Sequence, residues 1–135
     1  MSIQELKLPS RLESIDQAVI AVTEYAARAG FADDALFAVD LALRETVTNA
    51  VKHGNEFDET KDVVLTFEAV GDALEITVRD FGKGFAVEEV PDPTNPENLL
   101  KATGRGILFM NNFMDTVEWE NAAGGGTLVR LRKKR

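Results

Sequence analysis

The sequence predicts one α/β sandwich of the α+β kind, in which a mixed but mostly antiparallel sheet is covered on one face by helices. Its length of 135 residues suits a single domain that spans the whole chain. Two long segments repeat apolar residues at helical spacing, and several shorter segments alternate apolar and polar residues as strands do. The predicted order is strand, two helices, two strands, loop, helix and two strands.

The chain begins with an edge strand and a helix. Alternating residues at 3–8 predict a short strand that stops at Pro9. Ser10 and Glu13 have the spacing of a capping box, so a helix is expected to begin there and to end at Gly30. The core face of this helix consists of apolar residues at helical spacing: Leu12, Ile15, Val19, Val22 and Ala26.

A second helix follows and reaches Gly54. Asp33 or Asp34 can cap its start, and the glycine supplies its end. Its core face is again apolar, at Leu36, Val39, Leu43, Val47 and Ala50. A separate polar stripe has the character of an ordinary water-facing surface with an ion pair four residues apart, and consists of Asp40, Arg44 and Thr48.

The second half of the chain predicts strands and one long loop. Strands at 63–67 and 74–78 join across Gly71 and Asp72 as a β-hairpin. Residues 85–103 carry three prolines and many acidic or amide residues, and so long a loop in a small domain is typically a lid or a binding loop. The remaining elements are a short helix and two strands, at 107–113, 117–120 and 127–132.

The composition excludes several classes of protein. With 44% hydrophobic and 28% charged residues the chain can bury a core, and no apolar stretch is long enough to cross a membrane. The absence of cysteine excludes disulfides, so we expect a protein of the reducing cytoplasm. The net charge of -8 would repel a phosphate backbone, so nucleic acid is not an expected partner. The basic residues at 130–135 are interpreted first as a frayed, solubilising strand end and second as a docking patch.

The long second helix has another polar side, formed by Glu45, Asn49 and His53 one turn apart. The small residues Ala38 and Ala42 beside them leave room for a ligand. Carboxylate and amide oxygens suit Mg²⁺, which keeps most of its waters and binds substrate phosphates. Taken alone, however, Glu45 and Asn49 also fit an ordinary helix surface.

Asp80, Gly82 and Gly84 follow the hairpin. Two glycines at alternate positions let the backbone bend tightly and approach a ligand. The aspartate can accept a hydrogen bond from an amino group such as that of adenine. A plain turn between a strand and a loop is the alternative interpretation.

Two more glycine-rich turns lie further along the chain. Gly104, Arg105 and Gly106 precede the short helix, whose N-terminus attracts anions such as phosphate, although a bare turn at a helix entry fits as well. The glycines at 124–126 lead into Thr127, whose hydroxyl can lie near a base, and they also fit an ordinary hairpin loop.

The order of these motifs resembles the four ATP-binding boxes of the GHKL superfamily, which includes gyrase, histidine kinases and MutL. The N box and the three glycine boxes are similar, in order, to Glu45-Asn49-His53-Gly54, Asp80-Gly84, Gly104-Arg105-Gly106 and Gly124-Gly126-Thr127. Residues 48–54 and 110–115 are similar to the anti-sigma factor serine kinases in particular. Arg105 departs from the pattern, in which a smaller or apolar residue is expected, and neither Gly125 nor the basic tail has a counterpart in it.

The resemblance implies a GHKL ATPase-like fold with ATP and Mg²⁺ as cofactors. It implies that Asn49 binds Mg²⁺, that Asp80 binds the adenine amino group, and that Glu45 is the general base for the attacking hydroxyl. The other residues that it implies at the cofactor site are Gly82, Gly84, Gly104, Arg105, Gly106 and Thr127.

The resemblance also implies an anti-sigma factor and serine/threonine protein kinase, which phosphorylates an anti-sigma antagonist, holds a sigma factor and so regulates transcription. A histidine kinase is excluded because the single histidine, His53, ends the N-box helix. A gyrase-like protein is excluded because no length remains for its further domain. The alternative is an ATP-dependent partner-binding switch without kinase activity, because Glu45 alone supports chemistry. A homodimer is compatible with both.

Overall fold

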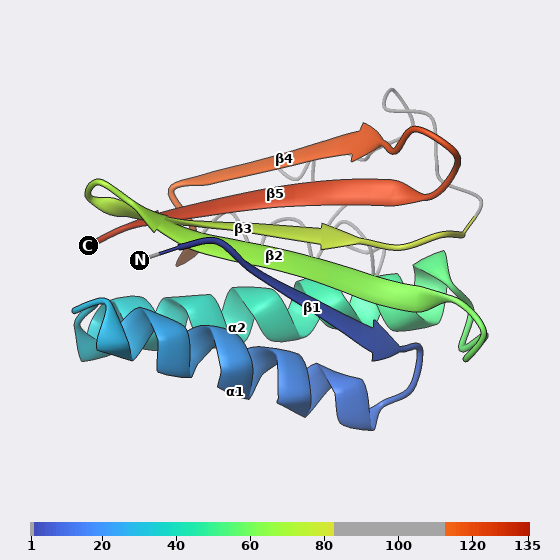
Figure 1. Ribbon diagram of the computed structural model, residues 1–135, viewed down its shortest axis with the longest axis horizontal. Coiled ribbons are helices and arrows are strands. Elements are labelled where there is room, and N and C mark those ends of the chain that lie inside the picture. Colours follow the sequence, from blue (N-terminus) through green and yellow to red (C-terminus); the bar gives the residue numbers. More distant parts are fainter. Residues whose placement is uncertain (1, 83–112) are drawn as a thin grey trace, which may run out of the picture.

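A computed structural model describes residues 2–82 and 113–135 as a two-layer sandwich of one sheet and two long helices (Figure 1). The sheet has five strands in the order β1-β2-β3-β5-β4, and each described strand pair is antiparallel. The strands and helices are β1 (Gln4–Pro9), α1 (Glu13–Arg28), α2 (Asp33–Asn49), η1 (Ala50–Gly54), β2 (Asp62–Val70), β3 (Ala73–Arg79), β4 (Thr116–Asn121) and β5 (Thr127–Lys134). The predicted fold class is confirmed.

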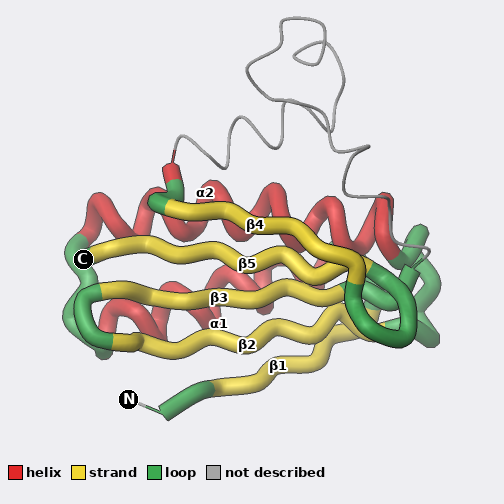
Figure 2. Tube along the Cα trace, turned by 90° about the horizontal axis from the view of Figure 1, so that it is seen from above, coloured by secondary structure: helices red, strands yellow, loops and turns green. Residues whose placement is uncertain are grey.

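The core lies between the helices and one face of the sheet. Figure 2 shows the five strands side by side, with β1 and β4 at the edges and both helices behind them. Alternate residues of the central strands are buried, as the sequence pattern predicts: Val63, Leu65, Phe67, Leu74, Ile76 and Val78. From α2 the fully buried side chains include Val39, Leu43 and Val47. The apolar periodicity therefore identified the inner faces of both layers, except at Leu12, which was predicted in the core but is 59% exposed at the start of α1.

The predicted capping box at the start of α1 is wrong. Leu12 occupies the cap position and no side chain caps the helix. The Ser10 side chain is buried, and its hydroxyl donates a hydrogen bond to the carbonyl oxygen of Lys61 at 2.5 Å. A capping serine uses its oxygen to accept from a backbone amide, but the Ser10 oxygen accepts from the side-chain amide of Asn55 at 2.8 Å, and Ser10 lies two residues before the cap position.

The start of α2 also differs in detail from the prediction. The cap residue is Ala32, without a side-chain hydrogen bond, and Asp33 and Asp34 fall in the first turn. The Asp34 carboxylate accepts a hydrogen bond from the Ala35 amide at 2.9 Å. Both acids still favour the helix start, because negative charge there opposes the positive end of the helix dipole.

The basic C-terminal segment is ordered, so the prediction of a frayed strand end is wrong. Strand β5 continues to Lys134. The Arg135 guanidinium lies 4.4 Å from the ring centre of Phe31 and donates a hydrogen bond to the Ala29 carbonyl oxygen at 2.6 Å. The Arg135 amide donates to the carbonyl oxygen of Asp72 at 2.8 Å. These contacts join the end of β5 to the α1–α2 turn and to the β2–β3 turn.

Several predicted features lie outside the described residues. They are the lid at 85–103, the short helix at 107–113 except its last position, and Gly84, Gly104, Arg105 and Gly106. None of the helices in the described ranges has the length and apolar character that a membrane crossing requires.

Candidate functional site

The site begins where α2 changes its winding. Residues Ala50–Gly54 form a π-helical turn, and the Asn55 amide donates to the Ala50 carbonyl oxygen at 2.8 Å, five residues back. Such widened turns are uncommon in helices and frequently mark functional sites. Here the turn carries the chain from the Glu45 and Asn49 side of α2 to Gly54, beside the end of β3.

Asp80 is the buried acid of the site, with a 6% exposed side chain directly after β3. Its Oδ1 atom accepts hydrogen bonds from the backbone amides of Gly82 at 3.1 Å and Thr127 at 3.2 Å. Burial raises the pKa of Asp80 above its usual value, because desolvation penalises the charged form more than these two amide donors favour it. No described residue donates a hydrogen bond to its second oxygen, Oδ2, which remains able to accept one from a ligand.

Three glycines allow the backbone to close around Asp80. A methyl group on Gly54 would overlap the Asp80 carboxylate, and one on Gly82 would overlap the carbonyl of Gly54. A methyl group on Gly126 would overlap the Asp80 carbonyl, and Gly126 also has a φ of +89°, which other residues rarely adopt. The structure thus brings the ends of the predicted N box, first glycine box and third glycine box to one place.

Gly82 was predicted to allow close approach of the backbone to a ligand. Its packing gives a second reason why a glycine is required at this position. The glycine lies against the Gly54 backbone, so that the turn after β3 fits over the end of η1. Thr127 is buried and pairs with Asp80 through both backbone groups, since the Asp80 amide also donates to the Thr127 carbonyl oxygen at 3.0 Å.

Glu45 and Asn49 lie one turn apart on α2, and both are partly buried. Within the described ranges neither side chain has a hydrogen bond or an ion pair to another residue. The alanines predicted to leave room beside them, Ala38 and Ala42, are buried. His53 is exposed in η1. The helix thus offers two uncommitted oxygen donors on the segment that leads to Asp80.

The oxygens of Glu45 and Asn49 suit Mg²⁺ better than they suit a cation that takes all of its ligands from the protein. Among the described residues no three His, Asp or Glu side chains gather at one point. Mg²⁺ commonly binds proteins through one or two oxygens and takes its other ligands from water and substrate phosphates. Asn49 and Glu45 supply oxygens of that kind.

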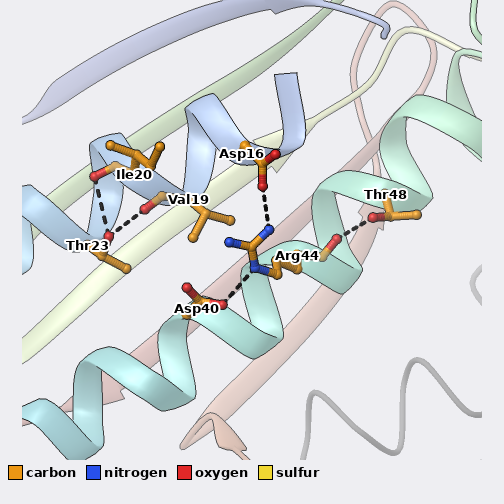
Figure 3. Close-up of polar contacts among 7 residues, drawn as sticks. All are labelled: Asp16, Val19, Ile20, Thr23, Asp40, Arg44 and Thr48. Carbon is orange, nitrogen blue, oxygen red and sulfur yellow. Dashed lines mark hydrogen bonds and ion pairs between the residues drawn. The ribbon is translucent and has the colours of Figure 1, made fainter. Parts of the chain in front are cut away.

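The other polar stripe of α2 is an ordinary surface, as predicted. Arg44 pairs with Asp40 at 2.8 Å, and its second partner is Asp16 of α1 at 2.6 Å (Figure 3). The hydrogen bond to Asp16, and next the one to Asp40, raise the pKa of the Arg44 guanidinium. The Thr48 hydroxyl donates to the Arg44 carbonyl oxygen at 2.5 Å. These groups satisfy one another and tie α1 to α2.

Sequence reasoning missed Asn55. Its side chain is 1% exposed, and its Oδ1 atom accepts a hydrogen bond from the Phe81 amide at 2.7 Å. Its Nδ2 atom donates to the Ser10 hydroxyl at 2.8 Å and to the Asp62 carbonyl oxygen at 3.1 Å. The available signal was a polar amide directly after the helix-ending Gly54, a place where it can bond the chain around it.

Together, a sandwich of this topology and a buried aspartate enclosed by glycine turns at a helix end fit the class of ATP-binding protein that the sequence motifs indicate. Residues 8–133 match the family model of the histidine kinase-like ATPase domain. The chain therefore belongs to the histidine kinase-like ATPase family, an ATP-binding family, and the GHKL resemblance is confirmed.

Individual relatives narrow the comparison. An anti-sigma F factor of Heyndrickxia coagulans is 37% identical in an alignment 136 positions long, and the alignment spans 96% of this chain and 90% of the relative. The serine-protein kinase RsbW of Oceanobacillus iheyensis is 28% identical over 126 residues, which cover 89% of this chain and 80% of the kinase. A crystal structure of the RsbU and RsbW domains of a Mycobacterium tuberculosis protein superposes with a TM-score of 0.72 at 18% identity, over 99% of this chain and 32% of that chain. The structural match supports the fold alone.

Proposed function

We propose that the protein is an anti-sigma factor and a serine/threonine protein kinase, which uses Mg-ATP to phosphorylate an anti-sigma antagonist and thereby regulates transcription. The likeness to an anti-sigma F factor and to a serine-protein kinase over nearly the whole chain supports this function. The observation that carries it is the meeting of Asp80 with Gly54, Gly82 and Gly126 at the end of the helix that bears Glu45 and Asn49.

Asp80 binds the adenine end of the nucleotide in this proposal. Its Oδ1 atom is held by the Gly82 and Thr127 amides, so its Oδ2 atom is left to accept a hydrogen bond from the adenine amino group. The backbone can come close to a flat base here because no side chain projects from Gly54 or Gly82. Thr127, whose backbone amide bonds the same carboxylate, supplies its hydroxyl as a second polar group for the base.

Asn49 and Glu45 act at the phosphate end. Asn49 holds Mg²⁺ through its amide oxygen, and Mg²⁺, when bound, neutralises phosphate charge. Glu45 takes the proton of the acceptor hydroxyl. As it does so, the hydroxyl oxygen bonds to the γ-phosphorus, and the bond from that phosphorus to the leaving ADP breaks. Four residues outside the described ranges complete the cofactor site in this proposal: Gly84, Gly104, Arg105 and Gly106.

The partners follow from the same proposal. The phosphate acceptor is a serine or threonine of the antagonist. The sigma factor binds to the kinase itself. This activity belongs to the cytoplasm, where sigma factors act on RNA polymerase. The second candidate function is an ATP-dependent switch that holds a partner without transferring phosphate. The nucleotide contacts account for ATP binding alone, and Glu45 is the one residue that supports catalysis.

Incubation of the protein with γ-labelled ATP and lysate of its source organism tests the proposal. We expect label on a serine or threonine of one small protein, which mass spectrometry identifies, and loss of that label with Glu45→Gln. ATP binding by both forms without any transferred label would support the switch instead. Absence of ATP binding would refute both functions.

A further inference from the structure

The buried amide of Asn55 has hydrogen-bond partners in three separate segments. Its Oδ1 atom accepts from the Phe81 amide, and its Nδ2 atom donates to the Ser10 hydroxyl and the Asp62 carbonyl oxygen. A backbone amide can only donate and a carbonyl can only accept, so the amide group has one allowed orientation. Asn55 therefore joins the end of η1 to the ends of β1 and β3 and to the start of β2.

Ser10 completes this connection. Its side chain is fully buried, its hydroxyl proton goes to the Lys61 carbonyl oxygen, and its oxygen accepts the bond from Asn55. The hydroxyl thus has a partner for its proton and a partner for its oxygen. Ser10 holds the Asn55 amide in place and does not reach the turn after β3.

The turn that bears the carboxylate has an acceptor for each of three successive backbone amides. Asp80 donates to the Thr127 carbonyl oxygen, Phe81 to the Asn55 side chain, and Gly82 to the Asp80 carboxylate itself. The Phe81 bond, at 2.7 Å, is the shortest of the three. It is also the only one of the three made by a side chain outside the turn and its neighbouring strand. Asn55 thus fixes the peptide next to the carboxylate from the helix side.

The structure assigns to Asn55 the role of a positioning residue, which with Ser10 holds the turn at 80–82 so that Asp80 presents its free oxygen to the adenine amino group. The assignment rests on the proposed ATP site. A hydrogen bond weakens steeply when its distance and angle depart from their optimum, so a turn that is free to shift loses recognition of the amino group first.

The test compares two nucleotides by calorimetry at neutral pH. ATP carries the 6-amino group, and purine riboside triphosphate is the same nucleotide without it. With Asn55→Ala we expect the affinity for ATP to fall by about tenfold, the worth of roughly one hydrogen bond to a charged group. The affinity for the purine analogue should change by less than about twofold, since its binding does not use the amino contact.

A matched control separates positioning from general destabilisation. Tyr25 is 2% exposed, and its hydroxyl accepts from the Ala69 amide at 2.9 Å and donates to the Ser2 carbonyl oxygen at 3.1 Å, on a different part of the sheet. Tyr25→Phe therefore also deprives a backbone amide of a side-chain partner. We expect it to lower the melting temperature and to leave the affinities for both nucleotides unchanged.

A double substitution supplies the second control. When Asp80→Asn has already removed the charged acceptor, adding Asn55→Ala should change ATP affinity by less than about twofold, because residues that act through one contact are not additive. If Asn55→Ala does not fold, Ser10→Ala takes its place, since it removes the support of the Asn55 amide and leaves the Phe81 bond. The same preferential loss of ATP is then expected.

Each outcome decides the assignment. A selective loss of ATP affinity supports it, and an equal loss for both nucleotides overturns it, because a merely structural role lowers both. Discrimination that persists in the Asn55 or Ser10 variant overturns the positioning role and leaves the proposed ATP site intact. A parent protein that binds neither nucleotide overturns both, and one that binds the two equally overturns the role of Asp80 and with it that of Asn55.

Discussion

Asp80→Asn should separate nucleotide recognition from stability. The substitution keeps the size of the side chain and removes its charge. The Oδ1 atom of asparagine can still accept from the Gly82 and Thr127 amides, so the turn keeps its hydrogen bonds. In the proposed site, the lost feature is the charged acceptor for the adenine amino group, a bond worth about 1.5–3 kcal/mol. ATP affinity should therefore fall roughly 10- to 150-fold.

The free energy of unfolding of the nucleotide-free protein should change in the opposite direction. Burial raises the pKa of Asp80 in the folded state above the ordinary value of 3.8, so the folded protein binds this proton more tightly than the unfolded chain does. The ionised carboxylate consequently lowers stability above the folded-state pKa, and this cost disappears as pH falls below the ordinary value. Asp80→Asn removes the cost, so the variant should be the more stable protein at neutral pH, with an advantage that shrinks on acidification.

Urea unfolding followed by circular dichroism, at several values between pH 4 and pH 8, measures the stability, and calorimetry measures ATP binding. Asp58→Asn is the control for which the opposite change in stability is expected at neutral pH. The hydrogen bond from the Thr60 hydroxyl lowers the pKa of the exposed Asp58 carboxyl, so its ionised form favours the folded state. A variant that is less stable than the parent at neutral pH would refute the argument from burial. Unchanged ATP affinity would refute the role of Asp80 in reading the base.

Four further substitutions test the remaining assignments. Asn49→Ala should weaken Mg-ATP binding by about 10- to 100-fold and leave magnesium-free ATP binding unchanged, and equal Mg-ATP affinity would remove Asn49 from the metal site. Glu45→Gln should lower the rate of phosphate transfer by about 10²- to 10⁴-fold with ATP affinity intact, whereas full activity would leave the base unassigned. Gly126→Ala should lower the free energy of unfolding by more than about 1 kcal/mol, because it combines a positive φ with a clash against Asp80, and a neutral effect in urea would contradict that packing. Arg135→Ala should cost about 1–2 kcal/mol in the same assay through loss of its contacts with Ala29 and Phe31, and no loss would show that the basic end contributes nothing to folding.

Tertiary contacts account for the predictions that were wrong. Ser10 has the right residue type and spacing for a capping box, but its hydroxyl bonds the carbonyl oxygen of Lys61, 51 positions away. The basic tail has the composition of a solvated end, but Phe31 and Ala29 offer a flat ring and an acceptor to Arg135, 106 positions from Ala29. Local patterns report what a residue is able to do, and distant partners decide which of those options it takes.

The sequence by itself determined the layers and the family, and it proposed most of the residues of the candidate site. Apolar periodicity identifies which face of each strand and helix is buried, because burial of apolar surface dominates the free energy of folding. The order of the four motifs was enough to indicate the ATP-binding family, which the match over residues 8–133 confirms. The residue types that suggested it were an amide at Asn49, a carboxylate at Asp80 and glycines that permit close approach, and their roles at the nucleotide stay predictions.

Only the tertiary structure decided how these motifs meet. Thr127 reaches the Asp80 carboxylate across 47 positions of sequence, and Asn55 reaches Phe81 across 26. The π-helical turn that carries Gly54 against Asp80 has no apolar pattern of its own. Such contacts depend on where the sheet and helices place separate segments. Their hydrogen-bond donors and acceptors occur in every turn, so the residue types alone do not identify the partner. Their partners therefore become visible only when the chain is folded.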